Sequence, residues 1–231
     1  MDSKELHDLF EEHPREVAPQ LLGCHLRVST GLGEVTVRLT EVEAYGDAGE
    51  DPGSHAYRGQ TPRNATMFGP PRHAYVYRSY GIHFCLNLVA GAEVAGGILL
   101  RAGEVVAGRQ LAVDRRGGTD TGPALLSGPG RLGQGLGITL PMDGTPVTIT
   151  QDEAPVSLGE RADQVRFQLF SKGASSYPIS SGPRVGVSGP GGGWEFPWRF
   201  WITADPTVSR YRPGKGVPAD LAKKTTELFH D

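Results

Sequence analysis

The spacing of apolar residues along the chain changes near residue 24. In residues 1–20 they recur at helical spacing, with Ser3 as a candidate N-cap and an interruption or restart at Pro14. From Cys24 onward apolar and polar residues alternate, which is the pattern of β-strands. The sequence therefore predicts a short helical segment over 1–20, followed by a domain built on a sheet.

The longest alternating segment runs from Glu34 to Tyr45. Because side chains alternate along a strand, one face is expected to carry Val35, Val37, Leu39, Glu41, Glu43 and Tyr45. An apolar stripe would thus continue into two carboxylates and a tyrosine. A glutamate at such a position is either a solvated strand end or a catalytic carboxylate, and the pattern alone leaves both readings open.

A hairpin is predicted after a long polar segment, residues 46–64, which is too irregular for a regular element and of a length typical of functional loops. Residues 67–71 are expected to form a second turn. Two alternating segments follow, residues 74–79 and 82–89, and Tyr80-Gly81 separates them as in a two-residue hairpin loop. An aromatic residue at a hairpin tip has little to pack on, so Tyr80 is interpreted as an interaction anchor.

Shorter segments extend the prediction over the rest of the chain. Further strands are expected at residues 96–101, 147–149, 165–169, 184–187 and 200–202. A helix is expected to enter at Ser127–Gly130, and 189–193 is read as a glycine-rich turn. With no internal repeat and no linker, residues 1–231 are expected to form one domain. The tail, 212–231, with Lys223 and Lys224, is expected to be partly disordered or a short surface helix.

Composition excludes several classes of protein. The 231 residues include 33 glycines and 18 prolines, which favours short strands and turns over a helical bundle. Cys24 and Cys85 make neither a disulfide framework nor a zinc site, and both are expected to be small buried residues. The sequence has no secretory signal and no apolar run long enough to span a membrane, so a soluble, cytoplasmic protein is expected.

The charge is unevenly distributed. The net charge is −3, but residues 1–53 hold 4 Lys/Arg against 12 Asp/Glu, whereas residues 54–116 hold 8 arginines against 3 acids. A basic middle segment in an acidic chain favours a local phosphate-binding face over non-specific coating of DNA. Arginines that merely form a solvated surface are the alternative.

Several motifs together resemble the alkyladenine (3-methyladenine) DNA glycosylase family, and specifically its bacterial members. The motifs are Glu43-Ala44-Tyr45, residues 60–64, Met67-Phe68, residues 75–77, Tyr80-Gly81, residues 84–87, Leu99–Arg101 and residues 127–132, with 184–187 more weakly. The match runs from about residue 21 to about residue 203.

The resemblance implies the fold, the activity and the partner. The implied fold is of the α/β class (α+β type): one domain around a curved antiparallel sheet, with flanking helices and a protruding hairpin that intercalates into DNA. The implied enzyme is a monofunctional hydrolase that needs no metal or cofactor. It would flip alkylated or deaminated purines out of double-stranded DNA and cut the N-glycosidic bond. It is expected to be a monomer associated with the bacterial nucleoid.

The resemblance also assigns roles to residues of this chain. Glu43 matches the general base that activates water, and Arg101 matches an arginine that helps to hold that water and the DNA backbone. Tyr45, His55 and Tyr77 match the walls of the base pocket, and Asn87 matches an asparagine that rejects the purine 2-amino group of guanine. Tyr80 matches the intercalating wedge, with Met67 and His83 as further minor-groove contacts. A tyrosine is commoner than histidine at the position of His83.

Two competing functions fit parts of the sequence. A recognition module that flips damaged bases without cutting them would retain Tyr80 and Asn87 but not need Glu43. A hydrolase of another glycoside could pair Glu41 with Glu43, since residues two apart on a strand lie roughly 7 Å apart. That second alternative leaves Tyr80 and the basic segment unexplained.

Overall fold

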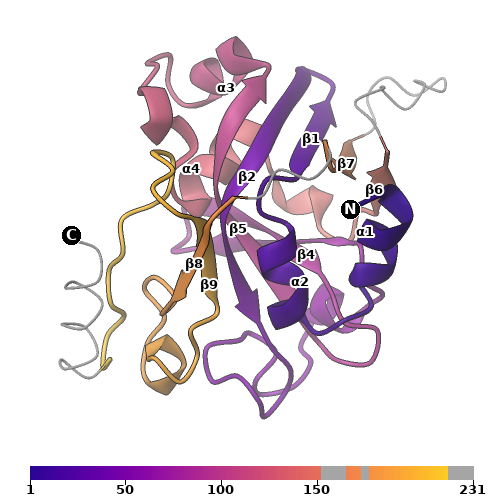
Figure 1. The fold of residues 1–231 in the computed structure, drawn as a ribbon, viewed down its shortest axis with the longest axis vertical. Coiled ribbons are helices and arrows are strands. Elements are labelled where there is room, and N and C mark those ends of the chain that lie inside the picture. Colours follow the sequence, from indigo (N-terminus) through magenta and orange to yellow (C-terminus); the bar gives the residue numbers. More distant parts are fainter. Residues whose placement is uncertain (152–164, 173–176, 218–231) are drawn as a thin grey trace.

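A curled, half-barrel sheet organises the chain in the computed structural model, which describes residues 1–151, 165–172 and 177–217 (Figure 1). The strand order is β3-β4-β5-β2-β1-β7-β6, and β8 joins through β9, which pairs with β2. The strands are β1 His25–Thr30, β2 Gly33–Tyr45, β3 Ala74–Ser79, β4 His83–Val89, β5 Gly97–Ala107, β6 Val147–Thr150, β7 Arg166–Phe170, β8 Ile179–Gly182 and β9 Arg199–Ile202. The pairs are antiparallel except β6 with β7, so the expectation of an antiparallel sheet needs that one correction.

Helices cover the sheet and share one apolar core with it. They are α1 Ser3–Leu9, α2 Pro14–Gln20, α3 Arg109–Arg115 and α4 Pro129–Leu136, with short 3-10 turns at η1 Ala65–Phe68, η2 Gly122–Leu126, η3 Leu140–Met142 and η4 Pro190–Gly192. In Figure 1, α1 and α2 lie in front of the sheet, whereas α4 packs against β4 and β5. Asp2, not Ser3, caps α1: its carboxylate accepts from the Glu5 N–H at 2.8 Å in a capping box.

Two adjacent β-bulges, one on β2 and one on β5, determine which side chains of these strands point into the core. Leu39 pairs with Gly103 and Glu41 with Ala102, so Thr40 is an extra residue on β2. Val42 then pairs with Leu100, so Arg101 is an extra residue on β5.

The first bulge reverses the phase of the side chains. Val35, Val37 and Leu39 belong to the core, and the core positions that follow are Val42 and Ala44. The prediction that one face of the strand carries Val35, Val37, Leu39, Glu41, Glu43 and Tyr45 is therefore wrong. Glu41, Glu43 and Tyr45 lie on the opposite face, away from the core.

The predicted β3–β4 hairpin is present. The Ile82 N–H donates to the Ser79 carbonyl at 3.1 Å, and Tyr80 and Gly81 both have positive φ, 48° and 72°. A turn with two such residues follows the twist of the paired strands, and glycine adopts that conformation without strain. The turn leaves Tyr80 90% exposed at the tip.

Several other boundaries differ from the predictions. Residues 184–187 form a loop, not a strand, and β8 and α3 were not predicted. Met67 lies in η1 instead of a plain turn, and β5 continues to Ala107. In the tail, residues 212–217 contain no helix or strand, and 218–231, with Lys223 and Lys224, lie outside the described residues.

Candidate active site

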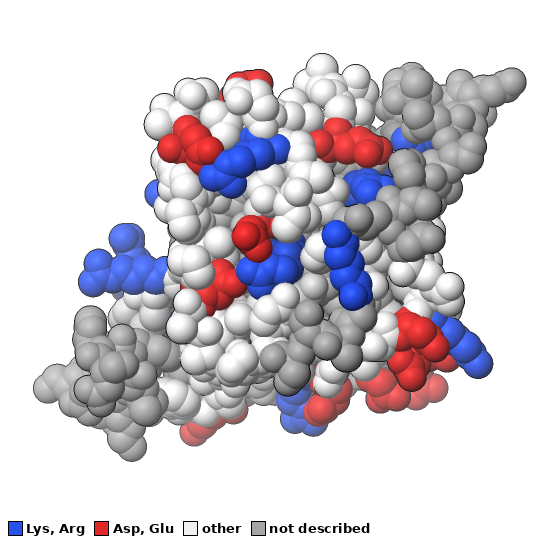
Figure 2. Space-filling model, turned by 45° about the horizontal axis from the view of Figure 1, so that its top comes forward, with Lys and Arg blue, Asp and Glu red and all other residues white. Residues whose placement is uncertain are grey.

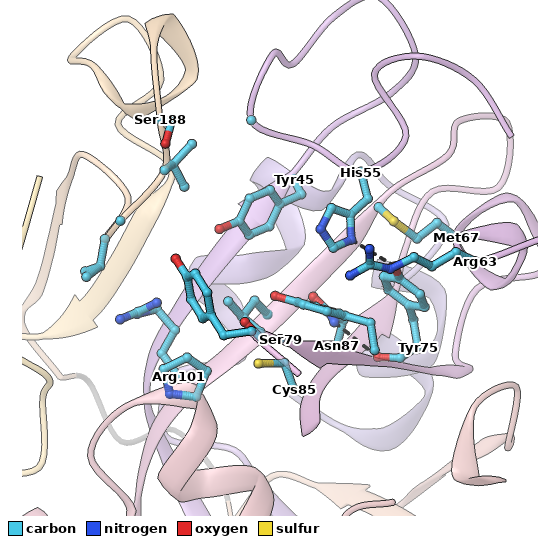
Figure 3. Close-up of a pocket in the computed structure, with 18 of the residues that line it drawn as sticks. Tyr45, His55, Arg63, Met67, Tyr75, Ser79, Cys85, Asn87, Arg101 and Ser188 are labelled. Atoms are coloured by element: carbon cyan, nitrogen blue, oxygen red, sulfur yellow. Dashed lines mark hydrogen bonds between the residues drawn. The ribbon is translucent and has the colours of Figure 1, made fainter. Parts of the chain in front are cut away.

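A cavity of about 730 Å³ opens beside the β3–β4 hairpin. Its walls come from the end of β2, the loop after it, the hairpin, β5 and the loop at 185–188 (Figure 3). Among the sequence-predicted site residues, those that line it are Tyr45, His55, Met67, Tyr77, Tyr80, Asn87 and Arg101. The fold thus brings together side chains spread over more than 50 positions of the chain.

Glu43 lies directly behind this cavity wall and is fully buried. Its Oε2 accepts hydrogen bonds from the Tyr45 hydroxyl at 2.8 Å and Arg101 Nη1 at 3.3 Å, and its Oε1 accepts from the Val185 N–H at 2.6 Å. All three donors line the cavity, although Glu43 itself does not. Every hydrogen bond that Glu43 accepts therefore comes from a residue of the cavity wall.

Arg101 connects Glu43 to a second buried carboxylate. Its Nε donates to Glu41 at 2.9 Å, and the two carboxylates raise the pKa of Arg101, although burial alone would lower it. The charge on Arg101 is therefore permanent. The side chain of Arg101 points toward the glutamates of β2 because Arg101 is the extra residue of the bulge on β5.

Glu41 is saturated with donors. It accepts from Arg101, Arg199 and both the N–H and the hydroxyl of Ser209. Burial alone would raise the pKa of Glu41, but the charges of Arg101 and Arg199 and the Ser209 bonds hold it below its ordinary value. Unlike the donors of Glu43, Arg199 and Ser209 do not line the cavity, so they separate Glu41 from it, and a Glu41–Glu43 pair acting on another glycoside does not fit the geometry.

The ring of Tyr45 is held from behind by Arg184. The guanidinium carbon lies 4.6 Å from the ring centre, and Arg184 is fully buried and absent from the cavity lining. Burial, and next the charge of Glu43, raise the pKa of Tyr45 well above its ordinary value. Tyr45 therefore stays protonated and keeps its hydroxyl available to donate to Glu43.

His55 and Tyr77 form an aromatic corner in the cavity wall. Their ring centres are 4.6 Å apart at 78°, an edge-to-face contact. His55 Nδ1 lies 2.9 Å from the Tyr75 hydroxyl, and the His55 carbonyl accepts from Asn64 Nδ2 at 2.8 Å. Desolvation, and then the charge of Arg63, lower the pKa of His55, which favours the neutral imidazole.

Asn87 and Cys85 lie on neighbouring inward positions of β4. In Figure 3 both point into the space between Tyr45 and His55 on one side and β4 on the other. Asn87 Nδ2 donates to the Tyr75 carbonyl at 3.1 Å, which fixes the amide at the floor of the cavity. Burial raises the pKa of the Cys85 thiol, so it is neutral there.

Met67 and His83 differ in exposure, and their role as minor-groove contacts stays a prediction. Met67 is 2% exposed and packs in the cavity wall with Ala56, Tyr75, Val89 and Ala95. His83 is exposed and lines a separate cavity with Ile82 and residues of α4. A Cβ on Gly130 would lie 2.8 Å from the His83 ring, so a glycine is what lets α4 approach the hairpin there.

Charge is interleaved on the surface. On the face in Figure 2, Lys/Arg and Asp/Glu of the described residues lie side by side over the middle of the surface, and acidic side chains gather at the lower right. Within the basic segment, Arg72, Arg101 and Arg109 pair with carboxylates. Basic character at the cavity itself comes from Arg63 and Arg212, which lie in its lining.

Sequence reasoning missed the residues that support the pocket. Asp51 forms a fully buried ion pair with Arg184, and Glu41, Arg199 and Ser209 surround Arg101. Arg184 lay in a motif that was noted, but it was assigned to a strand. Its partner Asp51 lies 133 positions away in the sequence, so no local pattern signals this support.

The described residues contain neither a candidate metal cluster nor a candidate membrane span. Within residues 1–151, 165–172 and 177–217, no group of three His, Cys, Asp or Glu side chains is placed to hold a metal ion. No helix in those ranges combines the length and apolar character that a membrane span requires.

Comparison with known proteins agrees with the geometry. The family model described as methylpurine-DNA glycosylase matches residues 8–206. A protein of Streptomyces avermitilis is 46% identical over 206 residues, which are 89% of this chain and 90% of the relative. A protein of Frankia casuarinae is 44% identical over 212 residues, with 89% and 92% covered, and one of Nocardia farcinica is 45% identical over 210, with 89% and 90% covered. All three carry 3-methyladenine DNA glycosylase in their names.

Proposed function

Since this chain belongs to the methylpurine-DNA glycosylase family, we propose that it excises alkylated purines, above all 3-methyladenine, from double-stranded DNA. The family makes it a hydrolase that acts on DNA. The finer proposal is that it flips the damaged nucleotide into the cavity and hydrolyses the N-glycosidic bond with a water activated by Glu43. An abasic site would remain.

One arrangement supports this mechanism most directly: a buried carboxylate stands behind an aromatic cavity, and each of its hydrogen-bond donors faces that cavity. A water that replaces one donor on Glu43 would lie between the carboxylate and the sugar of a flipped nucleotide. Glu43 can then accept its proton as the water attacks the anomeric carbon. The same negative charge stabilises the positive charge that develops on the sugar.

The cavity walls suit an electron-poor purine. The rings of Tyr45, His55 and Tyr77 can stack against a flat base, and tyrosine faces attract a cationic ring. The amide of Asn87 at the floor would collide with a 2-amino group, which excludes guanine. A cationic base such as 3-methyladenine leaves as a neutral molecule without a protein acid. Hypoxanthine and ethenoadenine, which would need a proton, are proposed as secondary substrates.

The exposed tip of the hairpin is the proposed contact with the duplex. Tyr80 is 90% exposed and also lines the cavity mouth, so it can fill the gap that a flipped nucleotide leaves in the stack. Arg63 and Arg212 at the same mouth can meet the backbone phosphates. The cavity is complete within one chain, which supports action as a monomer, and the substrate would place the enzyme with the chromosome in the bacterial cytoplasm.

The substrate range is tested with methylated DNA and with duplexes that carry a single hypoxanthine or ethenoadenine. Free base is measured before any alkali treatment, so that base release is scored separately from strand cleavage. The proposal predicts release of 3-methyladenine with intact strands. Binding of lesion duplexes without release of any base would instead establish a recognition module.

A further inference from the structure

Each of the three guanidinium nitrogens of Arg101 donates a hydrogen bond. Nε donates to Glu41 Oε1 at 2.9 Å, Nη1 to Glu43 Oε2 at 3.3 Å and Nη2 to the Ser209 hydroxyl at 3.1 Å. The planar guanidinium therefore has a fixed orientation. The bond to Glu43 is the longest of the three, so the other two determine where the charge lies relative to that carboxylate.

Glu41 is the centre of this arrangement. Its Oε1 accepts from Arg101 and from Arg199 Nε at 2.7 Å, and its Oε2 accepts from the Ser209 N–H at 2.7 Å. It is fully buried, and of its donors only Arg101 lines the cavity, so Glu41 reaches a bound nucleotide only through Arg101. Two arginines and two glutamates, Glu41 and Glu43, thus balance in charge within one buried network.

The segment after β9 supplies the remaining support. It is tied along β2 by the Thr207 hydroxyl, 2.7 Å from that of Thr40, and by Asp205, which accepts from Arg38 at 2.7 Å. These bonds bring Ser209 to Glu41, 168 positions away in the sequence. The bulge at Thr40 lies at the same place, so the strand irregularity and the network are parts of one local structure.

We propose that Glu41 is a positioning residue for base excision: it holds the Arg101 guanidinium against Glu43, and it balances the positive charge that would otherwise fall on Glu43 alone. This inference rests on the proposed function, in which Glu43 is the base. A buried ion pair adds little to stability compared with an apolar pair of the same shape. Beyond this small effect on stability, the network orients the charge of Arg101 beside the carboxylate of Glu43.

Loss of the Glu41 charge has a defined consequence. With Glu41→Gln, Arg101 loses the charged partner of its Nε, so the guanidinium is no longer fixed in orientation against Glu43. The bonds of Glu43 to the Tyr45 hydroxyl and to the Val185 N–H stay in place. The chemical step should therefore slow, while binding of the lesion duplex stays unchanged.

The test compares the wild type with Glu41→Gln in single-turnover release of 3-methyladenine and in binding of a lesion duplex. We expect the rate of release to fall about a hundredfold, as when a reacting group is misplaced by about an ångström, with lesion-duplex affinity unchanged. Glu34→Gln is the matched control, because it makes the same substitution on β2 at a carboxylate that accepts from the Ser29 hydroxyl and lies outside both the cavity lining and the network. It should keep the wild-type rate.

A purely structural role for Glu41 gives a different result. The fraction of folded enzyme would fall, and the folded fraction would bind the lesion duplex and release base at the wild-type rate. That outcome, or wild-type kinetics, would overturn the proposal. If Glu41→Gln does not fold, Ser209→Ala tests the proposal instead. It removes the hydroxyl that accepts from Arg101 and donates to Glu41, but it keeps the backbone N–H that donates to Glu41. It should lower kcat without weakening duplex binding, and unchanged kcat in Ser209→Ala would likewise overturn the proposal.

Glu43→Gln, measured in parallel, distinguishes failure of the proposed base, Glu43, from failure of the positioning role of Glu41. Full activity in that variant removes the proposed base and with it the proposed mechanism. An inactive Glu43→Gln beside an unaffected Glu41→Gln overturns only the positioning role.

Discussion

The guanidinium carbon of Arg184 lies 4.6 Å from the centre of the Tyr45 ring, on the side away from the cavity. The same guanidinium donates to both oxygens of Asp51 and to the carbonyl of Ala44. The loop after β2 and the loop that follows β8 are joined by this contact, side by side at the lower end of Figure 1. One buried cation therefore fixes both a cavity wall and the loop that carries His55.

Arg184→Met should destabilise the protein strongly. Arg184 and Asp51 are both fully buried, and removal of one partner leaves an uncompensated buried charge, which costs about 3–5 kcal/mol. Urea unfolding measures the change. The matched control is Arg109→Met, which breaks an ion pair with Asp120 whose side chains are both 45% exposed and should leave the unfolding midpoint nearly unchanged. Equal effects of the two substitutions would contradict the account.

Tyr80→Ala should weaken binding to a lesion duplex without changing stability. A ring that stacks on bases contributes about 1–3 kcal/mol, and a side chain that is 90% exposed contributes little to the fold. Fluorescence anisotropy with a duplex that carries an abasic analogue measures the affinity. Leu32→Ala, at an 81% exposed position in the β1–β2 turn, is the control and should bind as the wild type does. An intact affinity in Tyr80→Ala would remove the proposed wedge.

Asn87→Ala should allow guanine into the cavity. The shorter side chain vacates the floor position that the amide holds through its bond to the Tyr75 carbonyl. Release of guanine from undamaged DNA, undetectable with the wild type, should become measurable by chromatography of the free bases. Cys85→Ala also enlarges the cavity, two residues away on β4, and should not release guanine. Guanine release by both variants would mean that size alone, not the Asn87 position, sets the selectivity.

His55 should titrate below its ordinary pKa of 6.5, because desolvation and then Arg63 disfavour the imidazolium. The folded state therefore favours the neutral ring more than the unfolded state does. The stability this provides is fully present above pH 6.5 and is lost as the pH falls through the folded-state value. NMR titration, with His55→Gln to assign the resonance, gives the value. A pKa at or above 6.5 would contradict the environment described here.

Local patterns in the sequence predicted much of the scaffold and several site residues. Alternation identified β2 and the two hairpin strands, and a Tyr-Gly pair between alternating segments identified the turn that exposes Tyr80. These features depend on neighbours a few residues apart, which a pattern can describe.

The residues that support the site depend on partners far away in the sequence, so local sequence patterns could not predict them. Alternation cannot reveal an inserted residue, so the bulge at Thr40 reversed the predicted face of Glu43. Glu41 acquires its role only through Arg199 and Ser209, 158 and 168 positions away. Residues 184–187 alternate like a strand, yet the Val185 N–H donates to Glu43 in place of a neighbouring strand.

The central claim is that Glu43 activates the water that cuts the glycosidic bond, and the substitution Glu43→Gln tests it most directly. Both proteins are incubated with methylated duplex DNA, free 3-methyladenine is counted, and binding to a lesion duplex is measured on the same preparations. The account predicts rapid release by the wild type, and from Glu43→Gln a loss of release with duplex binding retained. Release at the wild-type rate by Glu43→Gln would contradict it.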